Sequence, residues 1–218
     1  MTGQHYIFDA YGTLLDIHAA VRRHAAAIGP DFQSFSDLWR TKQLEYSWVR
    51  TLMGAYADFW QLTQDALDFA LERFPAMDRA LRPALLDAYM RLDAHADVAD
   101  ALQRLKASGA RLAILSNGSP RMLETAVQSA GLAHVLDAVF SVDGVRHFKV
   151  HPLAYTPYKD SWQVPPRDVI FVSSNRWDVA GAACAGFSTV WLNRTGAPDE
   201  YRDHPPARII TSMRELGE

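Results

Sequence analysis

Short apolar runs, each followed by polar residues, recur through the second half of this chain. They occupy residues 111–116, 138–141, 169–172, 189–192 and 208–210. Around them, patterns typical of helices lie at about 97–108, 121–130, 152–162 and 179–185. Strands and helices that alternate in this way predict a parallel sheet flanked by helices, with right-handed connections.

One further apolar run, from Tyr6 to Phe8, stands near the start of the chain. A long block of helical patterns follows it, at about 17–28, 36–52, 57–74 and 80–92. Because a lone strand beside helices leaves its backbone groups without partners, we expect this first run to join the later sheet. The sequence thus predicts an α/β fold with a Rossmann-like core of residues 1–15 and 94–218, interrupted by a helical cap domain of residues 16–93.

Composition and charge narrow the class of protein. Of the 218 residues, 49% are hydrophobic and 22% are charged, which is ordinary for a soluble globular protein. The formal net charge of -3, with both signs interspersed, argues against nucleic-acid binding, and no apolar run approaches the roughly 18 residues of a membrane span. We therefore expect a cytoplasmic protein. The single cysteine, Cys184, lies among small residues and is expected to be buried.

The first apolar run ends in a carboxylate, Asp9, which a glycine turn follows. In open α/β sheets, ligands bind at the carboxyl ends of the strands, so Asp9 is a candidate catalytic group. The alternative is that Asp9 merely caps the turn.

Three later segments carry polar residues that could converge on Asp9. The turn at 116–120 could hold an anion or simply cap the next helix. Lys149 could place a positive charge beside Asp9, or could only be solvated. A second carboxylate, Asp178, follows the run at 169–172 and makes a pair of nucleophile and base possible.

Asp9, the Ser116 turn, Lys149 and Asp178, in this order, resemble the motifs of the haloacid dehalogenase superfamily, which has a parallel core and an inserted cap. Most members of that superfamily are magnesium-dependent phosphatases with a second aspartate two residues after the nucleophile. This chain has Tyr11 there, and the segment that begins at Ser173 offers few acidic ligands for a hard cation. The resemblance therefore implies neither metal nor other cofactor.

The closer resemblance is to the L-2-haloacid dehalogenases. It rests on residues 8–14, 39–48, 116–120 and 173–178. The segment 39–48 is the most specific of these because it lies in the cap, where members of the superfamily differ most. The resemblance implies that Asp9 displaces halide from C2 of a short (S)-2-haloacid. Water then hydrolyses the resulting ester and releases an (R)-2-hydroxyacid.

The family motifs also imply roles for individual residues. Arg40 would receive the halide with Asn117 beside it, and Lys149 would offset the charge of Asp9. Asp178 would help to activate the water. The substrate carboxylate would be held by Ser116 and by the backbone of Ala10 and Tyr11. The residues that would orient Asp9, Lys149 and the water are Thr13, Ser173 and Asn175. Tyr155 matches a further catalytic position of the family, near Lys149. The wall around the alkyl group would consist of Tyr11, Leu44, Phe59 and Trp177.

Several alternatives stay open at this stage. From its position alone, Arg40 could be a surface residue or part of a salt bridge within the cap, and the four wall residues could be ordinary core. Val150 stands where the family commonly has proline, while Thr41 and Arg176 also depart from the pattern. These changes could alter the substrate size or the leaving group.

The function itself has competing interpretations. The same ester chemistry would serve a fluoroacid or a strained small ring. A phosphatase or a non-catalytic binding protein are further alternatives. The partners implied by the resemblance are the 2-haloalkanoate, the halide and a second copy of the chain, because this family often forms homodimers.

Overall fold

The central sheet of the computed structural model is parallel, six-stranded and has the order β3-β2-β1-β4-β5-β6 among the residues that the structure describes, 4–217. The strands are β1 (His5–Phe8), β2 (Arg111–Ser116), β3 (Ala138–Ser141), β4 (Val169–Ser173), β5 (Ser188–Leu192) and β6 (Arg208–Ile210). The first strand, β1, pairs in parallel with both β2 and β4. The predicted α/β Rossmann-like fold is confirmed, and β1 lies at its centre.

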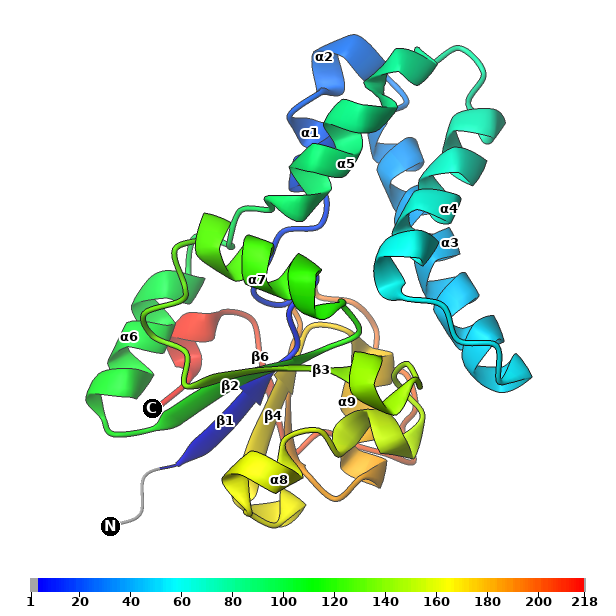
Figure 1. Cartoon of the computed structure of the whole chain (residues 1–218). Coiled ribbons are helices and arrows are strands. Elements are labelled where there is room, and N and C mark those ends of the chain that lie inside the picture. The colour runs from blue at the N-terminus through cyan, green and yellow to red at the C-terminus, as the bar shows by residue number, and fades with distance from the viewer. Residues whose placement is uncertain (1–3, 218) are drawn as a thin grey trace.

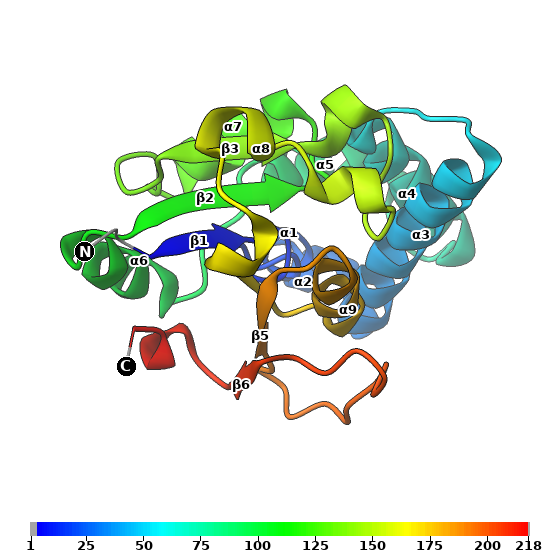
Figure 2. The ribbon, with the colours of Figure 1, turned by 90° about the horizontal axis from the view of Figure 1, so that it is seen from below.

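Helices cover both faces of this sheet. They are α6 (Val98–Ala107), α7 (Pro120–Ser129), α8 (Lys159–Trp162) and α9 (Arg176–Cys184). Figure 1 shows α7 and α8 on opposite faces of the sheet. The segment after β6 ends in a short 3-10 helix, Met213–Glu215, which returns to pack on α6 (Figure 2).

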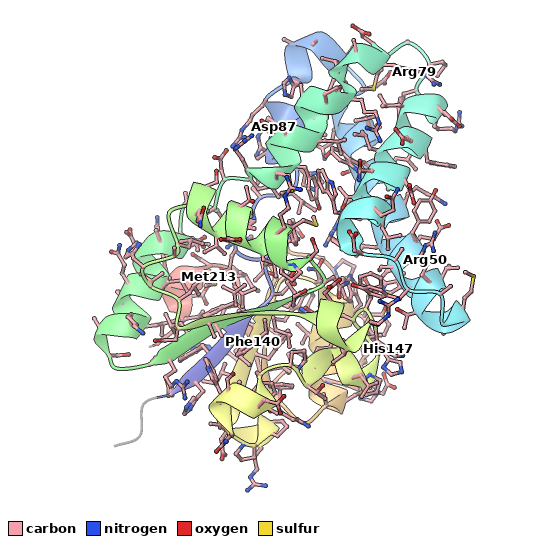
Figure 3. The ribbon with its side chains drawn as sticks, in the orientation of Figure 1. Arg50, Arg79, Asp87, Phe140, His147 and Met213 are labelled. Atoms are coloured by element: carbon pink, nitrogen blue, oxygen red, sulfur yellow. The ribbon has the colours of Figure 1, made fainter. Side chains whose placement is uncertain are left out.

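The other α-helices of the described residues stand together beyond the carboxyl ends of the strands (Figure 1). They are α1 (Ala19–Arg22), α2 (Ala25–Ile28), α3 (Phe32–Met53), α4 (Phe59–Arg73) and α5 (Arg82–Met90). The long helices α3 and α4 pack along each other, and α1 packs on α5. Side chains fill the space between these elements, while Arg50 and Arg79 lie at opposite ends of the helical group (Figure 3).

Two neighbouring chain segments connect the helical group to the sheet. Leu15 and Ala94 form an antiparallel bridge. The Asp16 amide donates to the Asp93 carbonyl at 2.9 Å, and the His95 amide donates to the Leu14 carbonyl at 3.0 Å. The chain therefore leaves and re-enters the sheet layer at one point, directly after the turn that follows β1.

Some predicted elements differ from the structure. The helix expected at 17–28 is divided into α1 and α2. The helix expected at 152–162 is a 3-10 turn, Pro152–Tyr155, followed by the short α8. Pro157 lies at the second break, where it has no backbone N–H to continue the hydrogen bonds of a helix. In contrast, α9 begins at Arg176, three residues earlier than its apolar pattern indicated.

The expectation for Cys184 was wrong, because this residue is exposed. The buried face of α9 is occupied by Ala182, which is fully covered. A residue two positions further along a helix points about 200° away, so Cys184 faces outward. Its sulfur lies 3.5 Å from Nδ1 of His204.

Candidate active site

Asp9 lies at the carboxyl end of β1 with its side chain buried. Its Oδ2 atom accepts hydrogen bonds from Asn175 Nδ2 at 2.8 Å, Thr13 Oγ1 at 3.1 Å and Ser173 Oγ at 3.5 Å. Its Oδ1 atom faces Lys149 Nζ at 3.1 Å. One carboxylate oxygen is thus held by three neutral donors, while the other has a single cationic partner.

The local backbone explains why Asp9 can be surrounded in this way. Its amide continues the sheet by donating to the Val172 carbonyl at 2.9 Å. Gly12 then turns the chain with a φ of +90°, a region that glycine adopts without steric cost. The turn brings Thr13 back under Asp9, where Thr13 Oγ1 also accepts from the Ser174 amide at 2.9 Å. The loops after β1 and β4 are therefore joined around the carboxylate.

Lys149 is buried between two carboxylates, with 1% of its surface exposed. Its Nζ atom lies 2.9 Å from Asp178 Oδ2 and 3.1 Å from Asp9 Oδ1. Burial lowers the pKa of the Lys149 ammonium, but Asp178 and Asp9 outweigh burial and raise that pKa above its ordinary value. Asn117 Oδ1 accepts from the Lys149 amide at 2.9 Å and so fixes its loop.

Asp178 is fully buried, and its two oxygens have different partners. Oδ2 accepts a hydrogen bond from Lys149 Nζ, and Oδ1 accepts one from the Tyr155 hydroxyl at 2.8 Å. Burial raises the pKa of the Asp178 carboxyl to about 6; Lys149 opposes this shift and Asp9 adds to it. Burial also holds the pKa of Tyr155 well above its ordinary value, so its hydroxyl keeps the proton that it donates.

Tyr155 reaches Asp178 because α9 has no side chain at Gly181. A Cβ atom built there would collide with the Tyr155 hydroxyl and would lie 2.8 Å from Cγ1 of Val150. A second close approach occurs at Gly118, where a Cβ would lie 2.8 Å from Cε2 of Tyr11. Both glycines therefore allow contacts that any larger residue would disturb.

Arg40 extends from α3 to the turn that follows Asp9. Its Nη2 atom donates to the Tyr11 carbonyl at 3.3 Å, and its Nη1 atom donates to Gln43 Oε1 at 2.7 Å. Asn175 Nδ2 donates to the same Tyr11 carbonyl at 3.3 Å. A guanidinium from the helical group and an amide from the sheet layer thus meet on one backbone oxygen beside Asp9.

The remaining predicted residues are two polar residues at the end of β2 and a set of mainly apolar residues. Ser116 and Asn117 are buried at the end of β2, and Ser116 Oγ accepts from the Gly118 amide at 3.1 Å. Tyr11 and Phe59 are buried with ring centroids 6.1 Å apart. Trp177 is half-buried, and its ring contacts that of Trp48 on α3 edge-on, with the ring centroids 5.5 Å apart. Of the other two predicted residues, Ala10 is buried beside Asp9 in the sequence, and Leu44 on α3 is half-buried.

Sequence reasoning missed residues that support Arg40. Gln43 is 1% exposed and accepts a hydrogen bond from Arg40. Tyr89 is buried, and its ring is stacked on that of Tyr11 with the ring centroids 5.7 Å apart. Gln43 lies three residues after Arg40 on one helix, a spacing that indicates contact. Tyr89 lies far along the chain on α5, and no local pattern connects it to Tyr11.

The three departures from the family pattern lie in different surroundings. Thr41 and Val150 are exposed. Arg176 is buried and points to the loop after β5, where its Nε pairs with Asp199 Oδ1 at 2.7 Å. Its Nη2 donates to the Tyr201 and His204 carbonyls, each at 3.0 Å.

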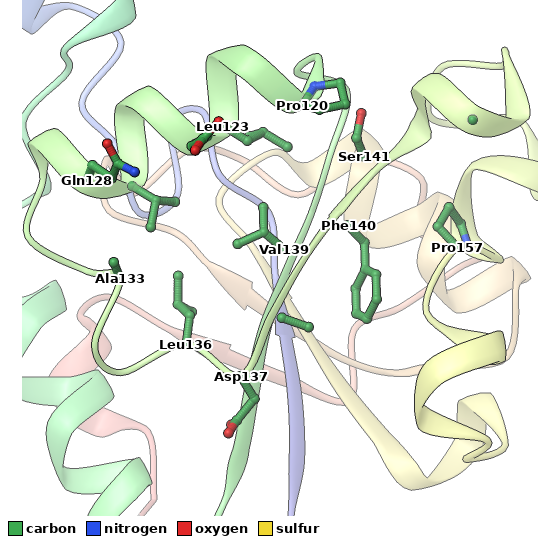
Figure 4. Close-up of a pocket in the computed structure, with 14 residues that line it drawn as sticks. Pro120, Leu123, Gln128, Ala133, Leu136, Asp137, Val139, Phe140, Ser141 and Pro157 are labelled. Carbon is green, nitrogen blue, oxygen red and sulfur yellow. The ribbon is translucent and has the colours of Figure 1, made fainter.

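A separate pocket of about 670 Å³ lies between α7 and β3 (Figure 4). Its walls are mainly apolar and include Leu123, Val139, Phe140 and Pro157. The acid at its edge, Asp137, already accepts from Lys106 and from the Leu112 amide. The polar groups converge at Asp9 instead, so the candidate active site is the Asp9 cluster.

Among residues 4–217, no group of three or more His, Cys, Asp or Glu side chains is placed to hold a metal ion.

The fold and the Asp9 cluster define a hydrolase of the haloacid dehalogenase type, and a family model described as haloacid dehalogenase-like hydrolase matches residues 4–186. The chain is 50% identical to (S)-2-haloacid dehalogenase 1 of Pseudomonas sp. (strain CBS-3), covering 96% of this chain and 93% of the relative. It is 48% identical to (S)-2-haloacid dehalogenase 4A of Burkholderia cepacia, covering 96% and 91%.

Solved structures agree with these relatives. A dehalogenase crystal structure matches with a TM-score of 0.95 and 46% identity, covering 99% of this chain and 96% of the other. L-2-haloacid dehalogenase from Xanthobacter autotrophicus, with chloropropionic acid covalently bound, matches with a TM-score of 0.89 and 36% identity, covering 98% and 96%. The chain therefore belongs to the L-2-haloacid dehalogenase family.

Proposed function

We propose that this chain converts short (S)-2-haloacids to (R)-2-hydroxyacids and halide through an ester on Asp9. The observation that carries the proposal is the arrangement of Asp9 itself. Thr13, Ser173 and Asn175 hold one oxygen, and Lys149 stabilises the negative charge. A carboxylate held in this way is preorganised as a nucleophile.

In the first step, an Asp9 oxygen attacks C2 from the side opposite the halogen. A carbon-oxygen bond forms, the carbon-halogen bond breaks, and the configuration at C2 inverts. Arg40 supplies a cation for the departing halide, with Asn117 beside it, while Ser116 and the backbone of Ala10 and Tyr11 hold the substrate carboxylate. Charge stabilisation of this kind is strong in a site that excludes water.

In the second step, water attacks the side-chain carbonyl carbon of Asp9, and the hydroxyacid leaves. Asn175 and Ser173 orient the ester and the water. Asp178, with a pKa of about 6, accepts a proton from the water and returns it to the alkoxide oxygen as the bond to Asp9 breaks. Tyr155 and Lys149 orient Asp178 through its two oxygens. The leaving halide needs no proton, which agrees with Tyr11 at the position where phosphatases have their acid, and we propose that the reaction requires no metal.

Chloride release from L-2-chloropropionate tests the proposed function. We expect release by the wild-type protein, little release from the D-isomer, and a rate unchanged by a metal chelator. The same panel should contain fluoroacetate and a phosphate ester. Magnesium-dependent phosphate release without chloride release from any haloacid would overturn the proposal.

We also propose that residues 16–93 form a cap domain over a core of residues 1–15 and 94–218. The adjacent crossings at Leu15 and Ala94 support this division. Limited proteolysis tests it, with cleavage expected first near these crossings; uniform resistance there would contradict the division.

No helix among residues 4–217 is long and apolar enough to cross a membrane, and we keep the cytoplasmic location as a prediction.

A homodimer is the oligomeric state that we propose. Apolar side chains at the end of α3 support it, because Leu52 is 87% exposed and Met53 is 63% exposed. Sedimentation should show a dimer that Leu52→Glu converts to a monomer. A monomeric wild-type protein at micromolar concentration would contradict this proposal.

A further inference from the structure

A buried polar network lies between α3, α4 and α5, behind Arg40. Gln43 is at its centre and is 1% exposed. Gln43 Oε1 accepts from Arg40 Nη1 at 2.7 Å and from the Tyr89 hydroxyl at 3.1 Å. Gln43 Nε2 donates to Thr63 Oγ1 at 2.7 Å. A buried amide with partners on both ends is held in one orientation.

The chemistry of Thr63 decides which way this amide faces. Its hydroxyl donates its single proton to the Phe59 carbonyl at 2.7 Å, so Oγ1 can only accept from Gln43. The amide nitrogen of Gln43 must therefore face Thr63, and the amide oxygen must face Arg40. Residues of α4 thus set the direction of the acceptor that holds the guanidinium.

We propose that Gln43 is a positioning residue that aims Arg40 at the departing halide and so sets how well the enzyme tolerates a poor leaving group. The inference rests on the proposed function, in which Arg40 receives the halide. An arginine side chain has many rotamers, and holding it in one of them removes an entropic cost from the reaction. Two anchors do this here, the Gln43 oxygen on one side and the Tyr11 carbonyl on the other.

The effect should depend on the halogen. A chloride leaves less readily than a bromide, so its departure depends more on a correctly placed cation. The ratio of kcat/KM for 2-bromopropionate to that for 2-chloropropionate reports this dependence, because kcat/KM includes the displacement step. The later ester hydrolysis is the same for both substrates. General damage to the fold would lower both values together and leave the ratio unchanged.

The decisive variants are Gln43→Leu, which removes the acceptor, and Gln43→Glu, which ties the Arg40 charge to a carboxylate. Thr63→Val is a nearly isosteric second variant that frees the amide to rotate while Gln43 itself remains. Gln64→Leu is the control, since Gln64 lies on the same helical group and donates to the Trp60 carbonyl. Circular dichroism and the melting temperature establish that each variant is folded.

We expect Gln43→Leu to lower kcat/KM for 2-chloropropionate by about 100-fold and for 2-bromopropionate by about tenfold, so the ratio rises about tenfold. Bromide as a product inhibitor should bind more weakly in both Gln43 variants. Thr63→Val should change both readouts in the same direction by a smaller factor, and Gln64→Leu should change neither. A folded Gln43→Leu with an unchanged ratio and unchanged bromide inhibition overturns the inference. Absence of halide release from the wild-type protein would instead refute the proposed function.

Discussion

The Nζ atom of Lys149 lies 3.1 Å from Oδ1 of Asp9, although the two residues are 140 positions apart in the sequence. The same ammonium lies 2.9 Å from Asp178 Oδ2, so two buried carboxylates share one buried cation. Removing any of these three charges changes the electrostatic balance of the other two. This triad therefore connects the proposed catalysis to the stability of the protein.

Replacing Lys149 with Met should abolish halide release and destabilise the fold by about 3–5 kcal/mol at neutral pH, because two buried carboxylates lose their partner. Lys149 lowers the pKa of the buried Asp178 carboxyl in the wild-type protein, so without Lys149 that pKa would lie still further above its unfolded value. The destabilisation should therefore be small at acid pH and grow as the pH rises. Urea unfolding at pH 5 and pH 8 measures this, and an equal loss of stability at both pH values would contradict the shared-cation account.

Replacing Tyr155 with Phe should shift the pH dependence of the reaction. The variant loses the hydrogen bond that stabilises the ionised Asp178 carboxyl, so its pKa should rise above about 6. Activity requires the ionised form, so the acid limb of kcat should move to higher pH. Tyr158→Phe is a matched control, because the Tyr158 hydroxyl is buried with no partner among residues 4–217. An acid limb at the same pH in Tyr155→Phe and wild type would refute this assignment.

The wild-type protein should also lose some stability as the pH rises between about 4 and 6. The folded pKa of Asp178, about 6, lies above the ordinary aspartate value of 3.8, so the folded state binds the proton more tightly. That stabilisation is complete below pH 3.8 and is lost as the pH passes through about 6. Asp178→Asn should remove this component of the pH dependence. Identical stability profiles for the variant and the wild type would contradict the raised pKa.

Gly181→Ala should lower activity although alanine favours helices by about 1 kcal/mol over glycine. The added methyl group would displace the Tyr155 hydroxyl from Asp178. Gly144→Ala is the control, because within residues 4–217 no other atom lies within 4 Å of its added Cβ. We expect Gly181→Ala to lower kcat by about tenfold or more. Wild-type kcat in a folded Gly181→Ala protein would show that the Tyr155 contact is dispensable.

Local patterns predicted much of this molecule, and the reasons are physical. Asp9 follows an apolar run and precedes a glycine turn, so its place at a strand end could be inferred from neighbouring residues alone. The convergence of Lys149 and Asp178 on Asp9 needed the order of the family motifs, because no local pattern records contacts between distant loops. Tyr89 could not be predicted for the same reason, because its ring contacts Tyr11 only once α5 packs over the turn that follows β1. Cys184 was assigned wrongly because small apolar neighbours do not reveal which face of a helix is covered.

Arg176 also shows that adjacency in the sequence does not determine which residues a side chain contacts. It adjoins Trp177, yet its guanidinium binds Asp199 and two carbonyls of the loop after β5. We expect Arg176→Ala to cost about 1–3 kcal/mol of stability through these charged hydrogen bonds. Its kcat/KM for 2-chloropropionate should stay within about twofold of wild type, since the contacts of Arg176 lie outside the Asp9 cluster. A folded variant with a changed substrate preference would contradict this expectation.

The most direct test of the account is a single turnover of L-2-chloropropionate in water enriched in oxygen-18, with protein in excess over substrate. If Asp9 is the nucleophile, water attacks its carbonyl carbon, and one labelled oxygen stays in the Asp9 carboxylate. Mass spectrometry of the peptide that contains Asp9 should show this label, while the 2-hydroxypropionate carries ordinary oxygen. Label in the hydroxyacid with none in Asp9 would mean direct attack of water on C2 and would contradict the ester mechanism.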